Sequence, residues 1–208
     1  MGTWSEAPRR IEVRVGTPND AKPFADLALM ASEPLFRIFA GSRALRVLEG
    51  VFRTPGNVSS YDKAFFATVD GVPQGMLQGF DWEQYRAERA YTDWVYFTKL
   101  GSRAIWTLIC LAYLPRWFGK PKPGEYYITH LATYPEFRGL GLATQLLSRA
   151  EQVARDSNCA ALSLDADLAN TLAMPLYLKI GFRIEEQALV KAPGLNLGRL
   201  CRMRKPLV

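Results

Sequence analysis

A glycine-rich turn between a strand and an amphipathic helix is the feature that most constrains how this 208-residue chain can fold. Residues 125–133 (EYYITHLAT) have strand character, the next loop contains Gly139 and Gly141, and residues 141–158 carry apolar side chains at helical spacing. Glycine tolerates positive φ angles, and a helix that begins directly after such a turn points its unpaired N–H groups and the positive end of its dipole at one place. The segment therefore predicts a site for a phosphate.

This loop matches neither of the two common nucleotide-binding signatures, because G-x-G-x-x-G is incomplete and no Gly-Lys-Ser/Thr occurs. A glycine pair alone is more typical of a plain tight turn, so a second pattern carries the argument. The pattern N-x-x-A-x-x-x-Y-x-x-x-G-F begins at Asn170, directly after a predicted strand over 160–166. It places Tyr177 two turns further along the same face of a helix predicted over 170–180. Together the two patterns are specific.

The rest of the chain predicts both helices and strands, and so an α/β (α+β) fold. Helical spacing of apolar residues over 21–52 predicts two or three helices, and Asp-Gly at 70 and 71 predicts a hairpin. The other strands are expected at 10–15, 63–69, 72–80, 182–190 and 200–206. We expect one domain of residues 1–208, with a helical, aromatic-rich insertion over 82–124 between the third and fourth strands.

With both patterns described, the chain resembles the GCN5-related N-acetyltransferase (GNAT) family, whose loop motif Arg/Gln-x-x-Gly-x-Gly/Ala is met by Arg138, Gly141 and Ala143. The resemblance is strongest from Tyr126 to Phe182, and it implies a GNAT-like fold with a mixed, mostly antiparallel central sheet flanked by helices. It implies an acyl-CoA-dependent N-acyltransferase that, most simply, transfers acetyl from acetyl-CoA to a primary amine by direct attack in a ternary complex. The acceptor, a small amine or a protein N-terminus or lysine, stays open. The alternative is a non-catalytic acyl-CoA-binding regulatory or interaction domain.

The same resemblance implies roles for three stretches. Strand residues Leu131, Ala132 and Thr133 would pair with the pantetheine arm of CoA, and Asn170 would steady its far end. Tyr177 matches the tyrosine that protonates the departing thiolate, for which a phenol is suited; the alternative is a packed aromatic ring. The residues expected to hold the pyrophosphate are Arg138, Gly139, Leu140, Gly141, Leu142, Ala143 and Thr144.

The general base is open among Asp165, His130 and a water molecule. Asp165 matches the family's acidic residue by its spacing before Asn170, and a solvated acid at a strand end is the alternative; Asp167, two residues on, would point to the same side. His130 is the only histidine. Strand alternation groups residues 127, 129, 131 and 133 on one face and residues 128, 130 and 132 on the other, and a bulge would reverse this grouping.

Composition excludes several other functions. The cysteines Cys110, Cys159 and Cys201 lack metal-ligand spacing and lie in or beside apolar segments, which predicts no metal and a reduced, cytoplasmic setting.

The net charge of +6 favours an anionic ligand. Nucleic acid is not expected, because alternating basic and apolar residues in LCRMRKPL are typical of a last strand with one solvated face. The N-terminal residues lack a secretion-signal pattern and the longest apolar run, 104–115, is too short to cross a bilayer, so we expect a soluble protein.

Three interpretations of the insertion remain. Its aromatic density favours buried packing or an interface, which comes first. It could instead form a wall of the acceptor site, or contact a membrane surface through basic residues around an apolar helix. The insertion and the last strands are also the candidate surfaces for a homodimer. Its aromatic residues are Trp82, Tyr85, Tyr91, Trp94, Tyr96, Phe97, Trp106, Tyr113, Trp117 and Phe118.

Overall fold

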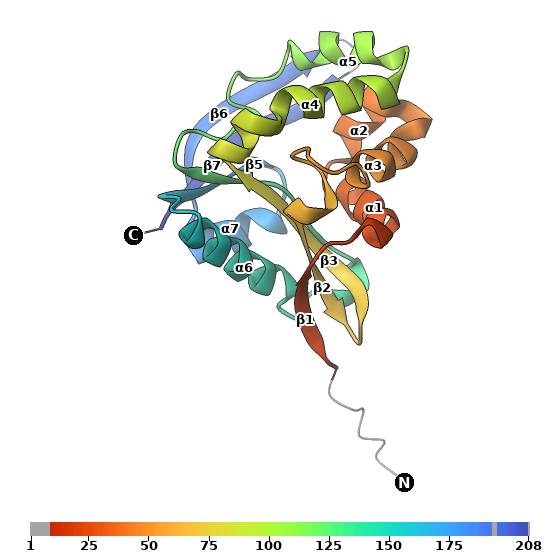
Figure 1. The fold of residues 1–208 in the computed structure, drawn as a ribbon. Coiled ribbons are helices and arrows are strands. Elements are labelled where there is room, and N and C mark those ends of the chain that lie inside the picture. The colour runs from red at the N-terminus through yellow and green to blue at the C-terminus, as the bar shows by residue number, and fades with distance from the viewer. Residues whose placement is uncertain (1–8, 193–194, 208) are drawn as a thin grey trace.

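The computed structural model describes residues 9–192 and 195–207, which build a seven-stranded sheet with helices on both faces (Figure 1). The strand order is β1-β2-β3-β4-β5-β7-β6, and only β4 and β5 are parallel neighbours. The strands are β1 (Ile11–Val15), β2 (Ala64–Val69), β3 (Val72–Asp81), β4 (Glu125–Thr133), β5 (Ala161–Asp167), β6 (Arg183–Ala192) and β7 (Leu195–Pro206). The α-helices are α1 (Ala21–Ala31), α2 (Glu33–Ala40), α3 (Ala44–Phe52), α4 (Trp82–Leu100), α5 (Arg103–Leu111), α6 (Leu142–Asp156) and α7 (Ala173–Ile180). The expected fold class is confirmed.

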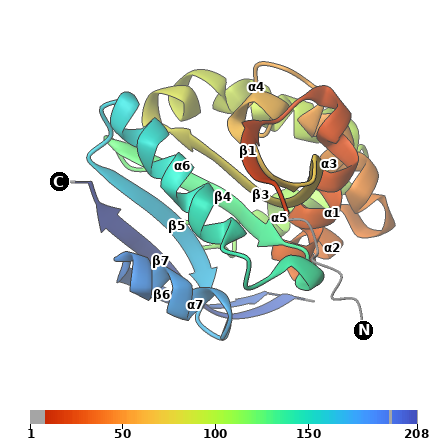
Figure 2. The ribbon, with the colours of Figure 1, turned by 90° about the horizontal axis from the view of Figure 1, so that it is seen from below.

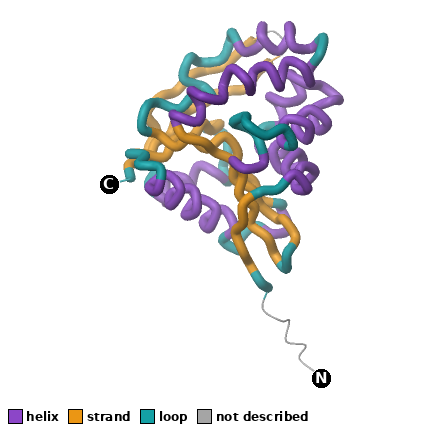
Figure 3. Tube along the Cα trace, in the orientation of Figure 1, coloured by secondary structure: helices purple, strands orange, loops and turns teal. Residues whose placement is uncertain are grey.

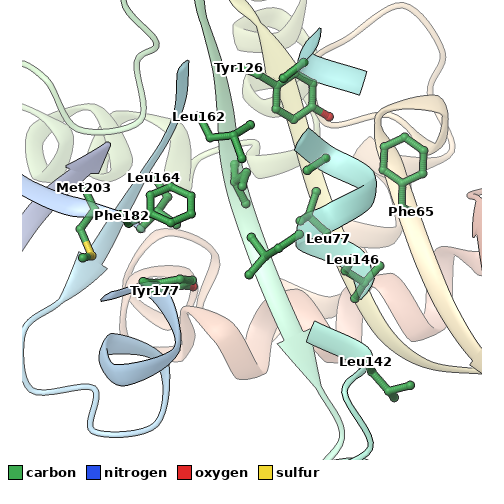
Figure 4. Packing of buried hydrophobic residues seen from close by; sticks show 14 of the residues in the cluster. Phe65, Leu77, Tyr126, Leu142, Leu146, Leu162, Leu164, Tyr177, Phe182 and Met203 are labelled. Carbon is green, nitrogen blue, oxygen red and sulfur yellow. The ribbon is translucent and has the colours of Figure 1, made fainter. Parts of the chain in front are cut away.

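Helices α6 and α7 cover one face of the sheet, and α1 and α3 cover the other (Figures 1 and 2). On α6 the buried positions Leu142, Leu146 and Ala150 recur every four residues, which aligns them on the face that packs against the strands. Figure 4 shows Leu142 and Leu146 on this face. Each leucine buried there contributes about 1.5–3 kcal/mol. On the opposite face Phe24 of α1 stacks on Phe52 of α3, with ring centroids 4.2 Å apart. Two separate cores thus hold the central strands in place.

The hairpin between β2 and β3 forms as the sequence predicts. Asp70 and Gly71 both have positive φ angles, 51° and 83°. Two consecutive positive φ angles define a type I′ turn, whose twist matches that of antiparallel strands. The turn therefore sets the pairing next to it, with Val69 opposite Val72, and the register shifts by one residue between Thr68 and Ala67.

The insertion between β3 and β4 is helical, as expected (Figure 3). Helix α4 begins with a capping box, in which the Gln84 amide donates to Asp81 Oδ1 at 2.8 Å and the Asp81 amide donates to Gln84 Oε1 at 3.1 Å. It ends before Gly101, whose φ is 58°. Helix α5 follows, and then residues 112–124 run without regular structure to β4. No helix among the described residues is both long and apolar enough to span a bilayer.

A β-bulge interrupts the pairing of β3 with β4. Gln78 pairs with His130, but the next residue, Gly79, pairs with Ile128, so Thr129 has no partner of its own. A bulge adds one residue to one strand and reverses which face its later side chains point to. The alternation of β4 therefore changes at Thr129.

The strand grouping expected for residues 127–133 is wrong because of this bulge. Ile128 and Leu131 both pack against the α6 core, although alternation assigns them to opposite faces. Tyr127 and His130 lie on the other face, where the His130 ring stacks on Phe36 with centroids 5.5 Å apart. The one-residue shift brings the histidine to the same side as Tyr127.

The hairpin of β6 and β7 is longer than expected, because β7 begins at Leu195 rather than at position 200. The segment LNLGRL contains asparagine and glycine, which are rare in strands. It nevertheless pairs with β6, and Gly198 lies opposite Val190. Pairing between the strands outweighs the weak local preference of these residues.

Candidate active site

The divergence of two parallel strands opens the site. Strands β4 and β5 pair only over Glu125–Ile128 and Ala161–Leu164, whereas β4 stays paired with β3, and β5 with β7, to their ends. Beyond Ile128 and Leu164 lies a cavity of about 1290 Å³. It is lined by the end of β4, the loop after it, the start of α6, the end of β5 and the start of α7. The two sequence patterns therefore meet at one cavity.

The start of α6 offers free amide groups to this cavity. Gly139 and Gly141 have φ angles of 80° and 79°, which residues with a side chain rarely adopt. The first backbone bond of the helix runs from the Gln145 amide to the Gly141 carbonyl oxygen at 3.0 Å, so the amides of residues 142–144 have no acceptor within the helix. Arg138 also lines the cavity. The arrangement suits an anion such as a pyrophosphate.

One of the predicted loop residues lies outside this lining. The side chain of Leu140 packs against the α6 core, whereas Arg138, Gly139 and Gly141 border the cavity. Leu142 does both, because its side chain is buried in the core while its backbone amide is at the helix start. Leu140 and Leu142 could therefore contact an anion only through their backbone groups.

The end of β4 presents a free backbone edge to the cavity. Leu131, Ala132 and Thr133 pair with β3 on one side. Their backbone groups on the other side would face β5, which has already diverged. All three residues line the cavity. A strand edge of this kind accepts an extended, amide-containing chain as an added partner.

Tyr177 of α7 lies at the opposite wall of the cavity, beside Phe182 (Figure 4). The two ring centroids are 5.8 Å apart, and the Tyr177 side chain is largely buried in the α6 core. Burial raises the pKa of the Tyr177 phenol to about 12. The hydroxyl therefore keeps its proton at neutral pH and can donate it.

Asn170 stands ahead of α7 rather than within it. Its Oδ1 accepts hydrogen bonds from the amides of Leu172 and Ala173, at 3.2 and 2.9 Å, and so holds the turn that leads into the helix. The helix consequently begins at Ala173, three residues later than predicted, and Asn170 and Tyr177 do not share a helix face. Asn170 still lines the cavity.

Asp165 lies near the end of β5 in a buried polar cluster that the sequence analysis did not foresee. Arg202 of β7 donates from Nε to Asp165 Oδ1 at 2.5 Å. The Tyr127 hydroxyl and the Gly119 amide donate to Asp165 Oδ2, both at 2.8 Å. Burial raises the pKa of the Asp165 carboxyl, against the opposing effect of Arg202 and the other donors.

The guanidinium of Arg202 also holds the exit segment of the insertion. It donates from Nη2 to the Trp117 carbonyl oxygen at 2.6 Å and from Nη1 to the Lys120 carbonyl oxygen at 2.9 Å. The Arg202 side chain is fully buried, and its guanidinium lies over the rings of Trp117 and Tyr127. We call Asp165, Arg202 and Tyr127 the polar clamp. It fastens residues 117–120 to the sheet beside Phe118, which lines the cavity.

The burial of Arg202 corrects the expectation that the basic residues of the last strand form a solvated face. Alternation alone puts Arg202 and Arg204 on one exposed side. The insertion covers that side, and Glu125, whose side chain is buried, pairs with Arg204 Nε at 3.2 Å. One signal in the sequence could have revealed the clamp. Glu125 and Asp165 are acidic residues in strands that are mostly apolar, and a buried carboxylate needs a cationic partner.

His130 borders the cavity, and among the described residues its buried ring nitrogens lack hydrogen-bond partners. Neither of its ring nitrogens has a hydrogen-bond partner in the described part of the chain, and the same holds for the side-chain amide of Gln78, which faces it across the β3–β4 pair. Burial lowers the pKa of His130 to about 4, so the ring is neutral at pH 7. A water molecule or substrate group is needed to satisfy these atoms.

Comparison with known proteins finds both a sequence relative and similar folds. A curated relative, N-alpha-acetyltransferase MAK3 of Arabidopsis thaliana, is 36% identical over 56 residues, which cover 27% of this chain and only 30% of that protein. The crystal structure of an N-acetyltransferase from Staphylococcus aureus Mu50 superposes with a TM-score of 0.68 at 21% identity, over 93% of this chain and 99% of that one. A PaiA N-acetyltransferase from Thermoplasma acidophilum, solved in complex with coenzyme A, has a TM-score of 0.53 at 13% identity, over 95% and 99% of the two chains.

These two solved structures share the fold. The family assignment comes from a separate match, because the model of the Acetyltransferase (GNAT) family fits residues 52–182, which is more than half of the chain. That range includes the loop, the free edge of β4 and Tyr177. The chain therefore belongs to the acetyltransferase (GNAT) family.

Proposed function

We propose that the protein is an acyl-CoA-dependent N-acyltransferase that, most simply, moves acetyl from acetyl-CoA to a primary amine. The observation that carries this proposal is the meeting of three features at one cavity: free amides at the start of α6, a free edge on β4, and the Tyr177 phenol. The first fits a pyrophosphate, the second fits the amide-containing pantetheine arm, and the third fits a proton donor. Membership of the family and the solved coenzyme A complex of a similar fold support it.

In the proposed reaction the amine attacks the thioester carbonyl carbon directly. A C–N bond forms, the C–S bond breaks, and its electron pair leaves on sulfur. Amides of β4 near Leu131 polarise the carbonyl oxygen, and Tyr177 gives its proton to the sulfur. The nitrogen, positively charged after the attack, gives a proton to a base. The base releases that proton to solvent and Tyr177 regains one from solvent, so the protons balance without a covalent enzyme intermediate.

We keep Asp165 as the proposed base, with His130 or a water molecule as alternatives. The raised pKa of Asp165 brings it nearer to neutrality, as a base needs, and Asp165 Oδ1 accepts one hydrogen bond from Arg202 Nε. His130 is neutral and faces the cavity, but its lowered pKa makes it a weaker base. Asp167, on the same strand end, is exposed and lines the cavity.

Asp165→Asn is expected to flatten the acidic limb of the pH–rate profile. In the unaltered protein the rate rises as Asp165 loses its proton, and burial moves that limb above the pH of an ordinary aspartate. The amide cannot accept the proton, so turnover falls and no longer follows this ionisation. Turnover is measured between pH 5 and 9, with urea unfolding alongside. An unchanged acidic limb in a variant of reduced stability would assign Asp165 to the clamp alone.

Acyl-CoA binding gives the direct test of the proposed function. A ligand present at about 100 times its dissociation constant should add about 2.7 kcal/mol to the free energy of unfolding. Thermal unfolding is followed with CoA, acetyl-CoA and longer acyl-CoAs, none of which requires the acceptor to be known. If acetyl-CoA stabilises the protein, amines and peptides are screened as acceptors by measuring thiol release. If a longer acyl-CoA stabilises it more, that acyl-CoA is used in the screen instead. Absence of any shift would contradict the proposal.

The non-catalytic alternative makes a different prediction for the same samples. A binding domain would be stabilised by acyl-CoA but would release no thiol with any amine, and it would need neither a base nor a proton donor. The buried phenol of Tyr177 at the cavity wall favours the enzyme.

A further inference from the structure

Helix α5 presents its apolar side outward. Ile105, Leu108 and Ile109 are 68%, 61% and 48% exposed, and their spacing of three and four residues puts them on one helix face. The opposite face, with Ala104 and Thr107, is buried. A surface helix of a soluble domain normally shows the reverse arrangement.

The end of α4 extends this surface. Trp94 and Phe97 are 60% and 50% exposed, and their rings stack with centroids 6.3 Å apart. Helices α4 and α5 contact each other and lie together at one end of the molecule (Figure 1). We name this surface the outer apolar face and define it by Trp94, Phe97, Ile105, Leu108, Ile109 and Leu111. Exposed apolar side chains on two neighbouring helices are typical of a binding surface.

The segment that forms most of the outer apolar face is basic, although Asp93, directly before Trp94, is exposed and lies 3.5 Å from Arg89. Residues 94–124 contain no aspartate or glutamate and five basic residues. Arg103 is held by the carbonyl oxygens of Ile38 and Phe39, and Lys122 pairs with acids of β6. Within the described residues Arg116 and Lys120 take part in no ion pair, and Arg116 is exposed. A partner that is apolar and negatively charged fits this basic segment.

We propose that the outer apolar face docks on a membrane surface that contains anionic lipids. An apolar helix face with tryptophan beside it enters the boundary between headgroups and acyl chains, and neighbouring cations bind the anionic headgroups. A second copy of this chain fits less well, because a two-fold interface would bring the same cations of both copies together. The helix lies on the bilayer and does not cross it. The proposal does not depend on the acyltransferase activity.

The test is sedimentation of the full chain with vesicles of phosphatidylcholine alone or with about one third phosphatidylglycerol. We expect binding to the anionic vesicles only, weakened by salt because part of the attraction is between charges. Arg116→Gln/Lys120→Gln should weaken binding about fivefold per charge removed. Ile105→Glu/Leu108→Glu should weaken it by about 100-fold or more, because two exposed side chains lose their apolar burial.

Val72→Glu is the matched control, because Val72 is 55% exposed in the β2–β3 hairpin, away from this face, and should leave vesicle binding unchanged. Circular dichroism confirms that each variant is folded. Absence of binding to anionic vesicles at millimolar lipid overturns the proposal, and so does equal binding by Ile105→Glu/Leu108→Glu. Concentration-dependent dimerisation that this double variant abolishes, without lipid binding, would assign the face to a second copy instead.

Discussion

Arg202→Met is expected to lower the free energy of unfolding by about 3–5 kcal/mol, the largest stability loss for any single change in the site. The methionine fills similar space but leaves Asp165 buried without its cation. The carbonyl oxygens of Trp117 and Lys120 also lose their donors. Urea unfolding measures the loss. The charge left unpaired, rather than the contacts removed, makes the change costly.

Arg37→Met supplies the control for this prediction. Arg37 pairs with Glu33 one turn away on α2, but both side chains are more than half exposed. Exposed pairs of this kind contribute about 0–1 kcal/mol, so the control should change stability little. The double variant Asp165→Asn/Arg202→Met should recover part of the loss, because it removes the uncompensated charge as well. If Arg202→Met were as mild as the control, Asp165 would not depend on its partner.

The same variant should loosen the exit segment of the insertion before the rest of the protein unfolds. The Gly119 amide donates to Asp165, and residues 117 and 120 are held through their carbonyl oxygens. Hydrogen exchange read by mass spectrometry should show faster deuterium uptake over 117–120 in Arg202→Met, with the α6 peptides unchanged. Uniformly faster exchange would mean that the clamp stabilises the whole fold and not this segment in particular.

Patterns within short stretches of the sequence predicted those elements whose structure depends on neighbouring residues in the chain. The α6 helix, the Asp70–Gly71 turn and the positions of most strands along the chain follow from periodicity and turn chemistry. The bulge at Thr129 does not, because nothing in EYYITHLAT marks it; it becomes visible only in the pairing of β4 with β3. That single residue decides which side chains of β4 face α6.

The clamp was missed for a similar reason. Asp165 and Arg202 are 37 positions apart, and Arg202 reaches across 85 positions to Trp117. Alternation describes one strand at a time and cannot tell that an insertion from elsewhere covers its charged side. Burial of an arginine is therefore a property of the assembled sheet. The catalytic predictions for Tyr177 and Asp165 rest on family resemblance and stay predictions.

Tyr177→Phe is expected to lower kcat about 100-fold or more while acyl-CoA affinity stays nearly unchanged. The phenylalanine keeps the ring that packs on Phe182 and removes only the hydroxyl. Without that donor the departing thiolate takes its proton from water. Since the interaction matters only as charge develops on sulfur, its loss affects the transition state and not the bound ground state. Thiol release gives kcat, and calorimetric titration with acyl-CoA gives the dissociation constant.

Tyr126→Phe separates the loss of the proton donor from the general cost of removing a buried hydroxyl. Tyr126 belongs to the same core as Tyr177 and is also buried, but it does not border the cavity. Its variant should retain kcat within about twofold, since it touches no reacting group. Unchanged turnover in Tyr177→Phe would remove Tyr177 from the mechanism. Parallel losses in kcat and acyl-CoA affinity would show that Tyr177 shapes the cavity, because a proton donor has no reason to strengthen binding of a thioester that has not yet begun to break.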